Sequence, residues 1–82
     1  MIKISLRVIV NVTGHLRELY PHLAEQEVVE SDLPLTVSEL IGKLGISPRM
    51  VMFAVLNERI IPKDRQLFDD CEINLVSPPA GG

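Results

Sequence analysis

Hydrophobic and polar residues alternate along the first ten positions of the chain. The apolar residues fall on one parity, and polar residues hold most of the other, with Lys3, Ser5 and Arg7 facing away from Ile2, Ile4, Leu6, Val8 and Val10. A period of two is typical of a β-strand with one buried face. We therefore predict a first strand over residues 2–10, in which only Ile9 interrupts the polar face.

The next stretch shows a broken helical pattern. Leu16, Leu19 and Leu23 have helical spacing, but Pro21 lacks a backbone donor and disfavours helix at the residue before it. We predict a short helical turn, a break, and a further turn starting at Pro21. A second, short strand is expected over residues 27–30.

The clearest local signal is a helix that starts after Thr36. Thr36 and Glu39 have the spacing of a capping box, in which each side chain accepts a hydrogen bond from the other residue's backbone N–H. An apolar stripe follows at positions i, i+3, i+4 and i+7, formed by Val37, Leu40, Ile41 and Leu44. Gly45 is expected to end the helix in the left-handed conformation.

The second half of the chain predicts strands and turns. Residues 50–56 are apolar on both parities, which indicates a strand that is central or covered on both sides, with Met50 and Met52 in the core. We predict a turn at residues 57–58, followed by a short strand over residues 59–61. A second turn is expected at residues 69–70, followed by the last strand over residues 72–76. Leu67 and Phe68 are expected to fill the core from a loop.

This order of elements, β-β-α-β-(β)-β, places one main helix on one face of a mixed sheet of four to five strands. The compact solution is an α+β fold of the ubiquitin-like β-grasp type. We predict a β-grasp domain over residues 1–76 and a flexible tail over residues 77–82.

Composition narrows the functional classes. A net charge of −3 and only three aromatic residues in 82 argue against nucleic-acid binding. The single cysteine, Cys71, excludes an internal disulfide and a cysteine-rich zinc site, and it fits a reducing compartment. We expect no bound metal, because His15 and His22 have no second cluster of ligands and are interpreted as surface residues. No apolar stretch reaches the roughly 20 residues of a bilayer span, so a cytoplasmic location is expected.

Four segments carry a resemblance to a known family. The helix TVSELIGKLG, the hairpin VLNERIIP, the turn DDCEINL and the tail SPPAGG resemble the MoaD/ThiS family of small β-grasp sulfur carriers. That family includes the small subunit of molybdopterin synthase and the sulfur carrier of thiamine synthesis. A terminal Gly-Gly alone is a weak signal, and its pairing with a β-grasp pattern is a strong one.

The resemblance implies chemistry at Gly82. A partner adenylyltransferase of the MoeB/ThiF type, similar to ubiquitin-activating enzymes, would use ATP with Mg to adenylate the Gly82 carboxylate. Sulfur would then replace an oxygen to form a thiocarboxylate, the sulfur donor in a second enzyme, such as the large subunit of molybdopterin synthase. This chain would be no catalyst alone and would bind no cofactor itself.

Physical chemistry is consistent with a threaded tail formed by Ser77, Pro78, Pro79, Ala80, Gly81 and Gly82. Six extended residues span about 20 Å, enough to carry a carboxylate deep into a partner. The two prolines stiffen the base of the tail, and glycine has no Cβ to obstruct a narrow tunnel.

The resemblance also implies a docking surface. Ile60 and Val76 match family positions that contact the partner enzyme, and the outward parity of the first strand adds Ile9 or Arg7 nearby. The alternative is a set of scattered surface aliphatics, which are normal on any protein.

The pathway stays open between two branches. The long connection between the first two strands and the proline-rich tail favour the molybdopterin branch, whereas the run from Arg59 to Pro62 resembles the thiamine carriers. A ubiquitin-like modifier joined to lysines through Gly82 and a plain interaction module are further alternatives.

The chain departs from the family at one turn, where the common Asp-Gly-Asp-Glu is replaced by DDCE. We expect Asp70 to adopt the left-handed geometry at some cost there, and Cys71 to be a small packing residue.

Overall fold

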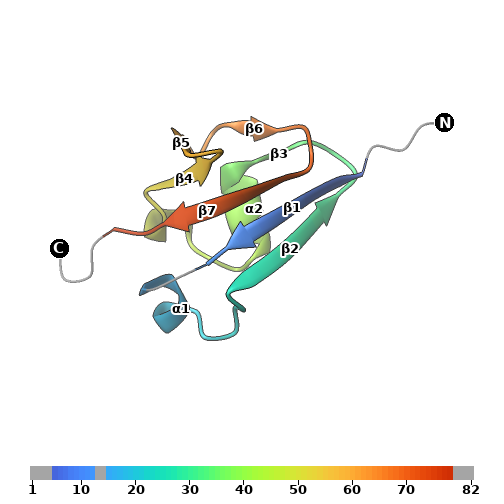
Figure 1. Cartoon of the computed structure of the whole chain (residues 1–82). Helices are drawn as coiled ribbons and strands as arrows, with labels where there is room; N and C mark the ends of the chain where they lie inside the picture. Colours follow the sequence, from blue (N-terminus) through green and yellow to red (C-terminus); the bar gives the residue numbers. More distant parts are fainter. Residues whose placement is uncertain (1–4, 13–14, 79–82) are drawn as a thin grey trace.

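The computed structural model of the chain describes residues 5–12 and 15–78. Seven strands, two α-helices and one 3₁₀ helix follow one another within these residues (Figure 1). In chain order they are β1 (Leu6–Asn11), α1 (His15–Leu19), β2 (Gln26–Ser31), β3 (Leu35–Thr36), α2 (Val37–Lys43), the 3₁₀ helix Pro48–Met50, β4 (Phe53–Leu56), β5 (Arg59–Ile61), β6 (Gln66–Leu67) and β7 (Cys71–Val76).

The main sheet has five strands in the order β2-β1-β7-β4-β5. The central strand, β7, pairs in parallel with β1, with Val10 opposite Ile73, and the other pairs are antiparallel. A parallel pair needs a long crossover connection, which the helix and the outer strands supply here. The mixed sheet with one main helix confirms the predicted ubiquitin-like β-grasp fold.

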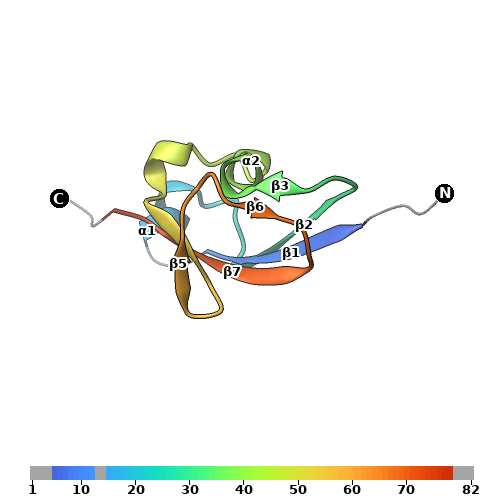
Figure 2. The same ribbon diagram turned by 90° about the horizontal axis from the view of Figure 1, so that it is seen from above.

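Helix α2 packs across one face of the main sheet, and no described element covers the opposite face (Figure 2). We call the uncovered side the open face. The covered face supplies the core: Leu6, Val8 and Val10 of β1 are at most 1% exposed, as their alternation predicts. The predicted apolar stripe of α2 is buried with them.

The capping box of α2 is present in full. The Thr36 hydroxyl accepts a hydrogen bond from the Glu39 backbone N–H at 3.1 Å, and the Glu39 carboxylate accepts one from the Thr36 N–H at 2.9 Å. Gly45 follows the helix with φ of +78°, the left-handed geometry predicted for it. The hydrogen bonds from Thr36 hold the pKa of Glu39 below its ordinary value.

A second sheet of two short strands, β3 and β6, lies beside the N-terminus of α2 and had no counterpart among the predicted elements. It brings the loop of residues 62–65 against the helix. Val37 and Ser38 donate their backbone N–H groups to the carbonyl oxygens of Arg65 and Lys63 at 3.0 and 2.8 Å.

Three predictions about the second half of the chain are wrong. Residues 50–52 form no strand: Pro48 starts a 3₁₀ helix that ends at Met50, and β4 begins only at Phe53. Met52 is 52% exposed and is therefore not a core residue, whereas Met50 is half-buried against the core. Phe68 is 60% exposed, because Leu67 alone turns inward from β6.

The expected left-handed geometry of Asp70 is also wrong. Among the described non-glycine residues, positive φ values occur only at Asn57 (52°) and Glu58 (66°). Asp70 instead accepts a hydrogen bond on its Oδ1 atom from the Arg7 backbone N–H at 2.8 Å. The pairing of β1 with β7 starts at Val8 opposite Cys71, so Arg7 lies just before it. The Asp70 side chain therefore provides an acceptor for a backbone N–H that β7 does not reach.

The connection between β1 and β2 contains the predicted helical turn, α1, followed by a turn at residues 21–22. Leu16 and Leu23 are buried, and Leu19 is 45% exposed. Within the described residues, no helix is long and apolar enough to cross a bilayer.

Candidate functional site

The base of the predicted tail lies at the C-terminal end of β7. Val76 is the last residue of the strand; it pairs with Phe53, and its carbonyl oxygen accepts a hydrogen bond from the Met52 N–H at 2.8 Å. Ser77 and Pro78 follow and are half-buried. The predicted tail residues Pro79, Ala80, Gly81 and Gly82 lie outside the described residues. Regular strand pairing thus stops where we predict the tail to begin.

The open face carries a contiguous group of apolar side chains beside this point. The sheet register places Val76 opposite Phe53, and Val55 opposite Ile60. Phe53 and Val55 are neighbours on the open side of β4, so they connect the two predicted docking residues. We call Phe53, Val55, Ile60 and Val76 the apolar patch; Ile60, 68% exposed, is its most accessible member.

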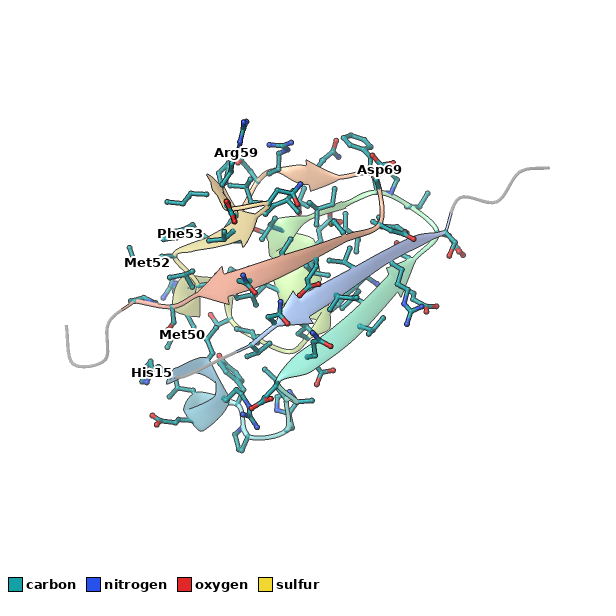
Figure 3. All side chains as sticks on the ribbon, viewed as in Figure 1. His15, Met50, Met52, Phe53, Arg59 and Asp69 are labelled. Carbon is teal, nitrogen blue, oxygen red and sulfur yellow. The ribbon has the colours of Figure 1, made fainter. Side chains whose placement is uncertain are left out.

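Phe53 and Val55 were missing from the predicted docking surface. The sequence could have indicated them. A two-residue turn at positions 57–58 places residue 55 opposite residue 60, and the alternation of a strand places residue 53 on the same face as residue 55. The positive φ values at Asn57 and Glu58 are those of such a tight hairpin turn. Met52, at the start of the same hairpin, is exposed beside Phe53 (Figure 3).

A polar row divides the open face. The Asn11 amide donates to Glu72 at 2.8 Å and to Asn74 at 2.7 Å, and its oxygen accepts from Gln26 at 3.1 Å. This row runs across β2, β1 and β7 and ends beside Val55, which is opposite Asn74.

The polar row separates the predicted docking residues into two groups. Ile60 and Val76 belong to the apolar patch. Ile9 lies on β1 between Val28 and Glu72, and Arg7 lies opposite Glu30. The structure therefore brings Ile60 and Val76 together in the apolar patch. Ile9 and Arg7 lie on the other side of the polar row.

Cys71 lies at the N-terminal end of β7, half-buried and packed against the core. Burial raises the pKa of its thiol, and the carboxylates of Asp70 and Asp69 raise it further, so the thiol stays protonated and is a weak nucleophile. The length of β7, about 17 Å for six residues, separates Cys71 from the base of the tail.

The two histidines have local roles. The Nε2 atom of His22 lies 3.2 Å from the carbonyl oxygen of Leu44, and its ring meets Tyr20 edge-on with the centroids 6.2 Å apart. His15 Nδ1 lies 3.7 Å from a Glu18 carboxylate oxygen. Within residues 5–12 and 15–78, no group of three or more His, Cys, Asp or Glu side chains could hold a metal ion.

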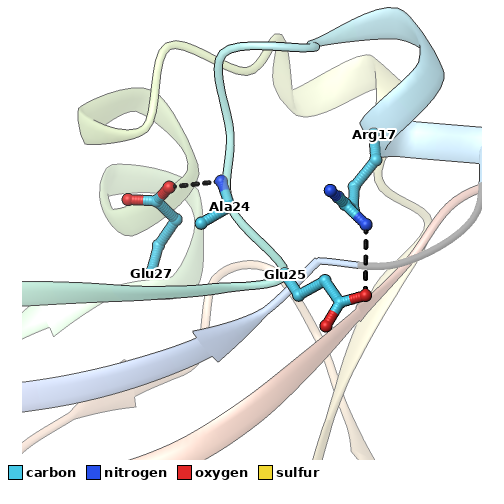
Figure 4. A network of polar contacts seen from close by, with 4 residues as sticks. All are labelled: Arg17, Ala24, Glu25 and Glu27. Atoms are coloured by element: carbon cyan, nitrogen blue, oxygen red, sulfur yellow. Dashed lines mark hydrogen bonds and ion pairs between the residues drawn. The ribbon is translucent and has the colours of Figure 1, made fainter.

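Acidic side chains organise the segment that leads into β2 (Figure 4). Glu27 accepts a hydrogen bond from the Ala24 N–H at 2.7 Å, and Glu25 lies 3.3 Å from the Arg17 guanidinium. The Arg17–Glu25 contact ties the residues before β2 to α1, and the Ala24–Glu27 hydrogen bond is local to the start of β2.

Comparison with known proteins identifies a matching family and a solved structure with a similar fold. The model of the ThiS family matches residues 10–82. Among solved structures, the chain is similar to the HVO 2177 protein of Haloferax volcanii, with a TM-score of 0.72 and 17% sequence identity. That similarity covers 100% of this chain and 92% of the other, and it shows the β-grasp fold alone. No curated protein matches the sequence.

Proposed function

The chain belongs to the ThiS family, and from that premise we propose that it is a sulfur carrier whose reactive group is the Gly82 carboxylate. In the first step, a carboxylate oxygen bonds to the α-phosphorus of ATP in a partner adenylyltransferase, and pyrophosphate leaves. In the second step, a sulfide-equivalent nucleophile attacks the carbonyl carbon, and AMP leaves. The product is a thiocarboxylate that donates its sulfur in an acceptor enzyme.

The observation that carries the proposal is the family match, which continues through the tail to residue 82. The geometry supports it, because strand pairing ends at Val76, which is itself part of the apolar patch. A partner that binds Phe53, Val55, Ile60 and Val76 would therefore receive the tail at the edge of its own contact surface. Six residues reach about 20 Å from that edge.

The activating chemistry is assigned to the partner. A carboxylate is a poor electrophile and needs activation, and the one Gly-x-x-Gly run of the sequence, residues 42–45, forms the end of α2 and no phosphate-binding loop. ATP and Mg would accordingly be held by the adenylyltransferase.

We propose the molybdopterin branch, with this chain as the small, sulfur-donating subunit of molybdopterin synthase. The long β1–β2 connection, which holds α1, supports this branch. The alternative is sulfur donation to thiazole synthesis in the thiamine pathway, favoured by the run from Arg59 to Pro62. Conjugation to protein lysines through Gly82 is a second alternative.

Intact-mass spectrometry tests the carrier function. The protein is incubated with its activating enzyme, ATP and a sulfur source, and a mass gain equal to replacement of one oxygen by sulfur is expected. A variant lacking Gly82 and a variant extended by one residue after Gly82 should show no gain. Sulfur transfer in those two variants would contradict the proposal.

The branch is tested by supplying the thiocarboxylate form to two acceptors in parallel. The large subunit of molybdopterin synthase should convert its pterin substrate, and a thiazole synthase should remain without product. The reverse result would move the protein to the thiamine branch. Isopeptide-linked lysine adducts would instead support the modifier.

A further inference from the structure

A groove lies at the end of the sheet away from the tail. Two adjoining hollows, with volumes of about 220 and 430 Å³, share Leu56, Asn57 and Arg65 as lining residues. The larger hollow extends to Arg59 on β5, and the smaller one extends along the segment of residues 66–71. We call the joined hollows the arginine groove.

Two arginine residues line this groove from different segments. Arg59 is the first residue of β5, opposite Leu56, and Arg65 belongs to the loop before β6. The backbone of Arg65 is held on both sides, since its N–H donates to Pro62 at 3.2 Å and its carbonyl oxygen accepts from Val37 at 3.0 Å. The base of the Arg65 side chain is therefore fixed relative to α2.

Neither guanidinium has a carboxylate partner within the described part of the chain. Glu58 and Asp64, the acidic neighbours in sequence, form no ion pair with Arg59 or Arg65, whereas Arg17 lies 3.3 Å from Glu25. Two like charges that line one concave surface repel each other unless an anion lies between them. Arginine is also the side chain best suited to bind a carboxylate through two parallel hydrogen bonds.

Beyond the arginines, the groove has a mixed lining of apolar and polar residues, the latter including Asn57 and Gln66. Leu56 and Leu67 line the hollow of 220 Å³, beside the exposed ring of Phe68. Asp69 and Asp70 line its far end, so the charge along the groove changes from positive to negative. Arg59 and Asp69 are labelled in Figure 3 on either side of this region.

The arginine groove is distinct from the apolar patch. Ile60 extends to the open face, and its neighbours Arg59 and Ile61 extend to the covered side, where Ile61 is buried. A partner bound on the open face would therefore leave the groove accessible.

We propose that the arginine groove binds an acidic peptide segment of a partner protein. A glutamate or aspartate of that segment pairs with Arg59 and Arg65, and an adjacent apolar side chain lies against Leu56 and Phe68. The positive charge of Arg59 and Arg65 favours an acidic segment, and the side chains of Leu56 and Phe68 favour an apolar neighbour beside the acidic residue. This binding is independent of sulfur transfer and of the tail.

The test uses NMR titration of the full, isotope-labelled protein with a peptide blocked at both ends, of sequence Glu-Glu-Leu-Leu. Saturable shift changes are expected at residues 56–59 and 65–69, and raising the salt concentration should weaken them. The double variant R59Q/R65Q should bind about three- to tenfold more weakly, as expected for exposed ion pairs. The single variant R49Q changes an exposed arginine outside the groove and should bind as the parent does.

Three outcomes would overturn the proposal. The first is equal binding of the peptide Lys-Lys-Leu-Leu. The second is equal loss in R49Q and in the double variant. The third is the same shift pattern and affinity with inorganic phosphate alone, which would make the groove a site for any anion. An unchanged amide spectrum in R59Q/R65Q, away from the substituted residues, verifies that the variant is folded.

Discussion

Replacing Thr36 by alanine should lower the free energy of unfolding, and the size of the loss follows from the hydrogen bonds at the N-terminus of α2. Val37 and Ser38 donate to backbone carbonyl oxygens of the loop of residues 62–65, so the substitution leaves their hydrogen bonds intact. The Glu39 N–H depends on the Thr36 hydroxyl, 3.1 Å away. One helix N–H therefore loses its acceptor.

The expected loss is about 1 kcal/mol of the free energy of unfolding, within a range of about 0.5 to 2 kcal/mol for N-cap substitutions. The site is partly exposed, so water replaces part of the lost bond, and values near the upper limit are not expected. For a domain of this size, 1 kcal/mol corresponds to a fall in Tm of about 4–8 °C.

Urea unfolding followed by circular dichroism measures this loss, with an unchanged slope expected because the surface exposed on unfolding is the same. Thr36→Ser keeps the acceptor oxygen and should retain most of the stability. Thr36→Val keeps the shape without the acceptor and should behave as alanine does. Equal destabilisation by serine and alanine would refute the capping explanation.

Three further predictions concern other parts of the molecule. Glu58→Gly should raise the free energy of unfolding by about 0.5–1 kcal/mol in urea unfolding, because glycine adopts the φ of 66° without steric cost; a loss of stability would contradict this. Ile60→Ser should weaken binding to the activating enzyme, measured by calorimetry. The control Val28→Ser changes an exposed aliphatic residue of the open face beyond the polar row and should leave binding unchanged. Equal effects of the two substitutions would show that the apolar patch is not the docking surface. The pKa of Glu39 is lowered in the fold, so its stabilising contribution is complete above the ordinary value of 4.5 and is lost as the pH falls through the lower folded value. Glu39→Gln should remove that part of the acid dependence of Tm, and an unaltered acid profile would show that Glu39 does not contribute.

Features with a local cause could be predicted from the sequence. The alternation of Leu6, Val8 and Val10 reflects one covered face of a strand, and those side chains are buried. The start of α2 follows from hydrogen bonds between Thr36 and Glu39, three residues apart, and its end follows from the backbone freedom of Gly45.

Features with a distant cause could not be predicted in this way. The family's usual glycine at the position of Asp70 suggested a strained turn, but Asp70 accepts a hydrogen bond from Arg7, 63 positions away in the sequence. The β3–β6 ladder pairs only Leu35 and Thr36 with Leu67 and Gln66, too few residues to leave a periodic signal. Phe68 follows Leu67 in an apolar pair, and only the register of β6 decides which of the two is buried.

In the candidate site, too, some features could be predicted from the sequence and others depend on contacts between distant residues. Ile60 and Val76 were identified from the family resemblance, and their connection through Phe53 and Val55 follows from strand register. The separation of Ile9 from them depends on the Asn11 hydrogen-bond row, which combines side chains from three strands.

The most direct test of the central claim is fragmentation mass spectrometry of the intact protein after reaction with its activating enzyme, ATP and a sulfur source. The proposal predicts that the replacement of oxygen by sulfur is found in the C-terminal fragment that contains Gly82 and in no fragment that ends before it. Sulfur added instead at Cys71, with an unmodified C-terminal fragment, would contradict the claim that the Gly82 carboxyl group carries the sulfur.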